Sequence, residues 1–201
     1  MNRFFLMVCV FWLAGCANMA DSMSALGGVG VISEKVSDFD GSRNVKLSPA
    51  FLYNPNAGLL GMNTRLGAFW NSEAPGFVAL LLENDSVSGY GISYINYESI
   101  DINIDGKKLS FDTDGGTKFD NSGYNTASRT IYTNSKNSAT VPVETLKAMI
   151  NAKDCRLRIN TGNGYETAYF SEEKTPGGNS TAKHFLRKFM DKVEGNNAES
   201  I

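Results

Sequence analysis

The chain has 201 residues, of which 19 are basic and 21 acidic, and its formal net charge is −2 with its one histidine neutral. A chain of this length is long enough to bury the core of a single domain. The near-neutral balance of mixed charges lacks the basic footprint of a nucleic-acid-binding protein, so we expect no nucleic-acid partner.

The first sixteen residues have the pattern of an export signal. Arg3 supplies one positive charge, and residues 4–13 form an uncharged apolar run that is too short to span a bilayer as a helix. The run closes on Leu13-Ala14-Gly15-Cys16, which resembles the lipobox of bacterial lipoprotein precursors. An ordinary secretory signal with a chance cysteine, or an uncleaved apolar helix, is the alternative.

The resemblance implies that residues 1–15 are a signal peptide, that cleavage follows Gly15, and that Cys16 becomes a lipid-bearing N-terminus. Its thiol would carry a diacylglycerol and its amine a further acyl chain, such as palmitate. Because each buried methylene contributes about 0.8 kcal/mol, two or three acyl chains hold a protein firmly on a membrane.

The residue after the cysteine bears on location. Aspartate there typically retains such lipoproteins in the inner membrane, whereas this chain has Ala17. The resemblance therefore implies a lipid-anchored protein of the cell envelope, in the outer membrane if the source is Gram-negative. The sequence leaves open whether the domain faces the periplasm or the exterior.

Three further segments follow from composition. Residues 16–30 are predicted to be the lipidated cysteine and a flexible tether, because the residues are small and show no periodicity. Residues 31–193 are predicted to be a single β-rich domain, and residues 194–201 a frayed tail.

Cysteine usage predicts a domain without an internal disulfide. Cys9 leaves with the signal and Cys16 is acylated, so Cys155 has no partner within the chain. Cys155 alternates with Leu157 and Ile159, which predicts a buried structural thiol, with a redox thiol as the alternative.

The first predicted strand pair is organised by Asp105-Gly106, a strong signal for a type I′ turn. Folding about it places Ile102 opposite Leu109 and Ile100 opposite Phe111 on an apolar face. Asn163-Gly164 predicts a second hairpin, with Ile159 opposite Ala168 and Leu157 opposite Phe170.

Other β-type runs complete the pattern. Phe77–Leu82 is apolar at consecutive positions, which predicts a central strand covered on both faces. Tyr90, Ile92 and Tyr94 alternate in another predicted strand, and Thr130–Thr133 predicts one more.

Two segments are predicted to be helices. Pro142 suits the first position of a short helix near 142–151, with Val143, Leu146 and Ile150 on one side. Asn179 or Ser180 is expected to cap a longer helix to about Val193. Its apolar stripe comprises Phe185, Leu186, Phe189, Met190 and Val193, opposite Lys183, Arg187, Lys188 and Lys192. The basic face is interpreted as solvated, with anionic lipid headgroups as the alternative partner.

Together these elements predict a mainly β fold. We expect an antiparallel, sandwich-like domain in which the C-terminal helix covers one sheet face or edge.

No catalytic residue, metal ligand or cofactor site is predicted. His184, the one histidine, lies in the first turns of the amphipathic helix, where a surface role is expected. Asp112–Gly116 with Asp120, and Asp38–Gly41, resemble fragments of calcium loops but lack the full spacing and the closing glutamate. Turn formation accounts for these Asp and Gly residues equally well.

Tyrosines form the candidate ligand-binding group. Tyr90, Tyr94 and Tyr97, with Tyr124 and Tyr132 further on, suit a platform for sugars or peptides. Ordinary packing of strand tyrosines is the alternative.

These observations lead to three hypotheses about function. The first is a membrane-anchored envelope lipoprotein with a non-enzymatic binding or assembly role, whose partner is an envelope protein or glycan. The second is a glycan or small-ligand binding module that uses a tyrosine-bearing sheet face. The third is a hydrolase that relies on Asp and Glu alone.

Overall fold

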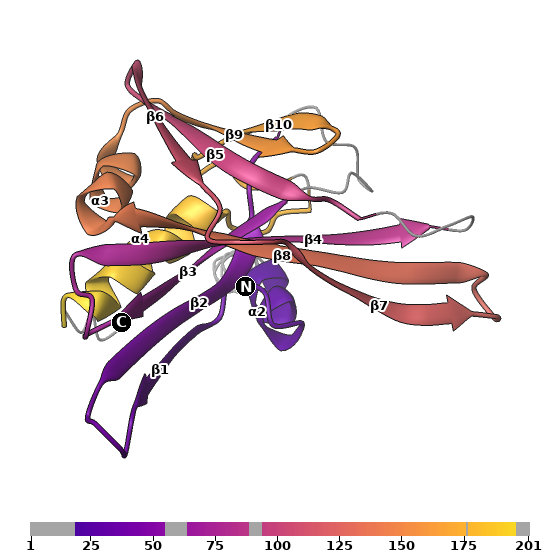
Figure 1. The fold of residues 1–201 in the computed structure, drawn as a ribbon, viewed down its shortest axis with the longest axis horizontal. Coiled ribbons are helices and arrows are strands. Elements are labelled where there is room, and N and C mark those ends of the chain that lie inside the picture. The colour runs from indigo at the N-terminus through magenta and orange to yellow at the C-terminus, as the bar shows by residue number, and fades with distance from the viewer. Residues whose placement is uncertain (1–18, 55–63, 89–93, 176, 196–201) are drawn as a thin grey trace, which may run out of the picture.

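A computed structural model describes residues 19–54, 64–88, 94–175 and 177–195. Two antiparallel sheets pack around one hydrophobic core, and two helices, α3 (Val143–Asn151) and α4 (Ala182–Val193), lie beside them (Figure 1). The predicted class, a mainly β, sandwich-like domain with a short helix near 142–151 and a C-terminal amphipathic helix, is confirmed.

The larger sheet has six strands. Their order is β1 (Ile32–Val36), β2 (Arg43–Phe51), β3 (Arg65–Asn71), β4 (Phe77–Ser88), β8 (Thr130–Pro142) and β7 (Lys118–Asn125). The smaller sheet has four strands, in the order β10 (Gly164–Tyr169), β9 (Cys155–Thr161), β5 (Tyr97–Ile104) and β6 (Lys107–Asp112).

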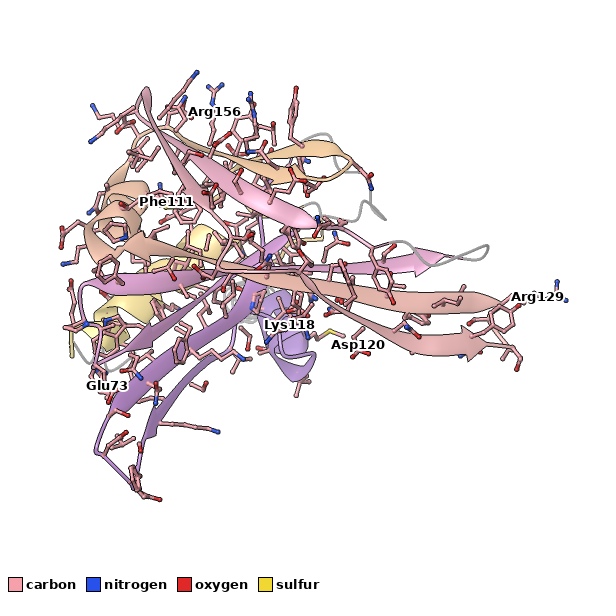
Figure 2. The ribbon with its side chains drawn as sticks, viewed as in Figure 1. Glu73, Phe111, Lys118, Asp120, Arg129 and Arg156 are labelled. Carbon is pink, nitrogen blue, oxygen red and sulfur yellow. The ribbon has the colours of Figure 1, made fainter. Side chains whose placement is uncertain are left out.

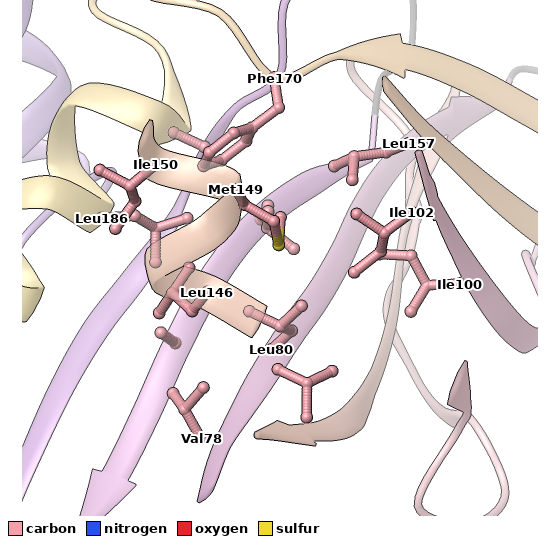
Figure 3. Packing of buried hydrophobic residues seen from close by; sticks show 14 of the residues in the cluster. Val78, Leu80, Ile100, Ile102, Leu146, Met149, Ile150, Leu157, Phe170 and Leu186 are labelled. Atoms are coloured by element: carbon pink, nitrogen blue, oxygen red, sulfur yellow. The ribbon is translucent and has the colours of Figure 1, made fainter. Parts of the chain in front are cut away.

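The core lies between these sheets and the two helices. Leu80 of β4 and Ile102 of β5 face it from the two sheets, and both are fully buried. Leu146 and Met149 of α3 are fully buried as well, and Figure 3 shows them between these strands and Leu186 of α4. The alternating apolar positions therefore meet across the domain as the sandwich prediction requires.

The first predicted hairpin is confirmed residue by residue. Ile102 pairs with Leu109, and Ile100 pairs with Phe111. Asp105 and Gly106 have φ values of 48° and 92°, as the two central positions of a type I′ turn require.

The predicted register of the second hairpin is wrong. Ala168 pairs with Leu157 rather than with Ile159, and Thr161 faces Gly164 across a loop of Gly162 and Asn163. The Thr161 hydroxyl donates to the carbonyl of Gly164 at 3.0 Å, which closes the loop one residue earlier. Because the pairing moves by two positions, the inward face is unchanged and Ala168 is still buried.

The apolar run at Phe77–Leu82 forms part of β4, which is a central strand as predicted. The prediction that both of its faces are covered is wrong. Val78, Leu80 and Leu82 are buried, whereas Phe77 on the other face is 55% exposed. The face of β4 opposite the core is therefore only partly covered.

Both helices carry the predicted apolar faces, but α4 begins differently. Thr181 is the N-cap rather than Asn179 or Ser180, because Ser180 binds Asp21 instead. The predicted exposure of Lys183 is wrong as well. Its ammonium donates to the carbonyl of Ala152 at 3.1 Å, at the C-terminal end of α3, where a cation is favourable.

The prediction of a flexible tether over 16–30 is wrong for the part that is described. Met19–Leu26 form helix α2. The hydroxyl of Ser24 donates to Asn179 at 2.6 Å, and Asp21 accepts two hydrogen bonds from Ser180. Helix α2 is therefore joined to the segment that precedes α4, and residues far apart in the sequence hold it.

Candidate functional site

Three strands extend beyond the two-sheet body, to the right in Figure 1. They are the second half of β4 (83–88), β7 (118–125) and the first half of β8 (130–136), and we call them the arm. All eight residues of β7 are exposed. Arg129 marks the tip of the arm in Figure 2. The arm is therefore accessible to a partner along β7.

Local hydrogen bonds explain the tip. The side-chain carbonyl of Asn125 accepts from the backbone N–H groups of Ala127 and Ser128, at 2.9 and 3.1 Å. Arg129 then adopts a φ of 54°, which reverses the chain into β8. An Asx turn of this kind shapes a tight end without apolar packing.

The outer face of the arm, away from the core, carries a charged network. Glu83 lies 3.5 Å from Arg65 and 3.3 Å from Lys136, and it accepts from the Asn134 amide at 2.8 Å. Arg65 also contacts Asp85. The side chains of Asp85 and Lys136 are 54% and 56% exposed, and ion pairs at such exposed positions contribute little stability individually.

The inner face of the arm is polar although it is buried. Asn84 is 2% exposed and Ser86 is 4% exposed, and Thr133 and Ser135 beside them on β8 are each 2% exposed. The Asn84 amide nitrogen and the Ser86 hydroxyl have no hydrogen-bond partner in the part of the chain that is described. Buried polar atoms are rarely left unpaired, so this pair of atoms is suited to a polar guest.

A half-buried carboxylate lies where the arm joins the body. Glu166 of β10 accepts from the Thr64 hydroxyl at 2.8 Å, and the same hydroxyl lies 3.4 Å from that of Tyr97. Burial raises the pKa of Glu166, although hydrogen bonds from Thr64 oppose the shift. Burial likewise raises the pKa of the Tyr97 phenol. Sequence reasoning missed Glu166, yet its alternation with Ala168 placed it on the inward face.

The predicted tyrosine platform does not form one surface among the described residues. Tyr97 is 2% exposed and belongs to the core. Tyr94 precedes β5 and packs on Phe119 of β7 with ring centroids 4.7 Å apart, and its hydroxyl accepts from Asn121 at 3.0 Å. Tyr90 lies outside the described residues, as do Gly15 and Cys16, the predicted cleavage and lipidation positions.

Tyr124 and Tyr132 lie on the arm instead, 57% and 49% exposed. Tyr124 pairs with Ile131 on one face, whereas Tyr132 pairs with Val87. The two rings are therefore presented on opposite faces of the arm, and the arm has an aromatic side chain on each face.

Cys155 and His184 have the structural character that was predicted. Cys155 is 4% exposed and unpaired, and burial raises the pKa of its thiol to about 12. His184 is half-buried in the first turn of α4, and desolvation lowers its pKa. Neither residue is presented to a substrate as a reactive group.

The aspartates of the two calcium-loop fragments hold turns and strands. Asp114 accepts from the Ser138 hydroxyl at 2.7 Å and the Thr140 amide at 3.0 Å. Asp40 accepts from the Ser42 amide at 2.9 Å, and hydrogen bonds from Ser37 and Ser42 lower its pKa to about 2. Among the residues described, no group of three His, Cys, Asp or Glu side chains is arranged to hold a metal ion.

The described helices are all too short or too polar to cross a bilayer. Comparison with known protein families, with characterised proteins and with solved structures finds no match for this chain.

Proposed function

We propose that the chain is a membrane-anchored lipoprotein of the cell envelope and that its β domain binds another envelope component without catalysing a reaction. The anchor rests on Leu13-Ala14-Gly15-Cys16 after an apolar run. The binding role rests on the arm, and above all on β7, which pairs with β8 on one side and has every residue exposed.

An exposed edge strand is a ready template for a strand of another chain, because its free backbone groups can extend the ladder. Exposed aromatic residues are enriched in binding surfaces, and the arm carries Phe119, Tyr124 and Tyr132 at 48–57% exposure. Lys118 and Asp120 in β7 and the bulge between Asn121 and Tyr124 limit indiscriminate pairing. These features support a selective partner, either a protein or a glycan of the envelope.

Cys16→Ser tests the anchor. We expect this substitution to abolish palmitate labelling and to release the protein from membranes. Membrane fractionation and labelling that persist in the variant would show that the anchor assignment is wrong.

Shortening the arm tests the binding role. Asn121 faces Thr133 across the β7–β8 pair, so residues 122–132 can be replaced by an Asn-Gly turn that joins the two positions. We expect the full-length variant to keep a melting temperature close to that of the wild type and to lose the crosslinked envelope species that the wild type forms. Retention of those species in the folded variant would contradict the arm as the binding element.

A ligand-binding module is the second candidate, favoured by the Asn84 amide nitrogen and the Ser86 hydroxyl on the inner face of the arm, which have no hydrogen-bond partner among the described residues. A glycan hydroxyl can satisfy both groups. The ring of Tyr94, which precedes β5, packs on Phe119 of β7, and Phe119 shares the inner face through its pairing with Ser135. Asn84→Ala should then weaken binding to isolated envelope glycans, whereas Asn96→Ala, an exposed change before β5, should not.

A further inference from the structure

A hollow lies on the outer face of the six-stranded sheet, away from both the core and the arm tip. Its volume is about 370 Å³, within the range of small-molecule sites. Its apolar floor includes Leu81 and Pro49, and three lysines surround it, Lys46 from β2, Lys118 from β7 and Lys136 from β8.

The pairing of the strands creates this hollow. Leu81 faces Gly67 on β3 and Ser138 on β8, so it has no bulky neighbour on either side. Strand β2 bulges between Leu47 and Ala50, opposite Gly67. A Cβ at Gly67 would lie 2.5 Å from the carbonyl oxygen of Leu47 and 2.9 Å from the nitrogen of Pro49. Only glycine therefore permits the bulge that brings Pro49 to the wall of the hollow.

The charges around the hollow are unbalanced. Lys118 and Lys136 are directly opposite each other in the β7–β8 register, and like charges in this arrangement destabilise a sheet. Glu83 lies 3.3 Å from Lys136, but Arg65 and Asn134 also bind it. Among the described residues, neither Lys46 nor Lys118 forms an ion pair. The rim thus holds three ammonium groups around one carboxylate that is already compensated.

We propose that this hollow binds a small anionic amphiphile. Its phosphate or carboxylate lies among Lys46, Lys118 and Lys136 and relieves the repulsion between the last two. Lysine binds such groups as a mobile point charge. The apolar part of the ligand lies on Leu81 and Pro49. The ligand is either a free molecule or the headgroup region of a membrane lipid. Lys118 and Lys136 belong to the base of the arm, but the site does not involve the arm tip.

Calorimetric titration tests the proposal with octyl phosphate, inorganic phosphate and octanol as probes. The protein is the chain from residue 16, which contains every described element, with Cys16→Ser so that no acyl chain competes. We expect saturable binding of octyl phosphate, and binding of inorganic phosphate and of octanol that is at least tenfold weaker. Equal affinity for octyl phosphate and octanol, or no binding of octyl phosphate, would overturn the proposal.

Two variants separate the site from general charge effects. Lys46→Glu should weaken octyl phosphate binding at least tenfold. Lys35 is exposed on β1, on the same outer face of the sheet as Lys46 but outside the hollow. Lys35→Glu should therefore leave octyl phosphate binding unchanged. If both variants weaken binding equally, the attraction is diffuse and the proposal fails.

Lys118→Gln should raise the melting temperature of the free protein while weakening binding, because it removes the like-charge pair.

Vesicles identify the source of the ligand. If vesicles of phosphatidylglycerol, but not of phosphatidylcholine, recruit the protein and Lys46→Glu prevents this, the ligand is a lipid. If octyl phosphate binds and neither vesicle does, the ligand is a free molecule. A third result would contradict the site. In that result the protein does not bind octyl phosphate, and phosphatidylglycerol vesicles recruit the wild type and the Lys46→Glu variant equally.

Discussion

Asp21 in helix α2 accepts hydrogen bonds from both the backbone N–H and the hydroxyl of Ser180, each at 2.7 Å, across 159 positions of the sequence. Burial alone would raise the pKa of Asp21, but these two hydrogen bonds, together with the nearby Lys174 and His184, outweigh it and the pKa is lowered. The carboxylate therefore favours the folded state at neutral pH, and it ties the N-terminal helix to the start of α4.

Asp21→Ala should release α2 from the domain. Hydrogen bonds to a charged group contribute about 1.5–3 kcal/mol, and the partial exposure of this pair reduces the expected loss of unfolding free energy to about 1–2 kcal/mol. Hydrogen exchange should become fast over residues 19–26, while Asp38→Ala, in the exposed β1–β2 turn, should change neither quantity. Unchanged protection of α2 in the Asp21 variant would show that other contacts hold the helix.

The packing of α4 can be tested by a matched pair of substitutions. Phe189 is fully buried, and removing a buried phenylalanine side chain typically costs about 3–5 kcal/mol. Phe189→Ala should therefore lower the melting temperature clearly, whereas Lys188→Ala, next to it and exposed, should scarcely change it. Helix α4 contacts β2 and β3. Equal, small shifts measured by calorimetry would contradict this docking.

Cys155 should react slowly with a thiol reagent in the folded protein. With a pKa of about 12, roughly one thiol in ten thousand is ionised at pH 8, and only the thiolate is nucleophilic. Labelling should become rapid when denaturant unfolds the chain. Rapid, stoichiometric labelling of the native protein would place this thiol at the surface and restore the redox alternative.

Glu166 should make stability depend on pH. Its pKa is raised in the folded state from an ordinary value of 4.5, so the folded protein holds the proton more tightly than the unfolded chain. The unfolding free energy must then fall as the pH rises from the unfolded pKa through the folded pKa.

Glu166→Gln removes this dependence and keeps an acceptor for Thr64. The variant should gain stability relative to the wild type at pH 7 and lose that advantage near pH 4, as measured by denaturant titration at each pH. Glu98→Gln, an exposed change in β5, is the matched control and should follow the wild type. A Glu166→Gln profile parallel to that of the wild type would show that this carboxyl is not perturbed.

Local signals predicted part of the fold correctly. Asp105-Gly106 defines its own turn, so every pair of the β5–β6 hairpin follows from the sequence. The second hairpin did not follow, because the Thr161 hydroxyl decides where its loop closes. Helix α2 was missed because its contacts, Asp21 to Ser180 and Ser24 to Asn179, join distant segments that no local pattern relates.

The candidate site was harder to predict than the fold. Asn84, Ser86, Thr133 and Ser135 occupy inward positions of β4 and β8, but polar residues in a strand are ordinarily expected to face solvent. The hollow forms because Leu81 pairs with two small residues, Gly67 on β3 and Ser138 on β8. That arrangement needs the sheet order, which composition and periodicity do not supply.

Photocrosslinking in the intact envelope is the measurement that tests the arm most directly. A photoreactive residue is placed at Tyr124 or Tyr132, which are 57% and 49% exposed on the arm, or at Phe39, which is 98% exposed in the β1–β2 turn. We expect both arm positions to form a covalent adduct with the same envelope component, whereas Phe39 should form none despite its greater exposure. Adducts from Phe39 alone, or from all three positions equally, would contradict a binding role for the arm.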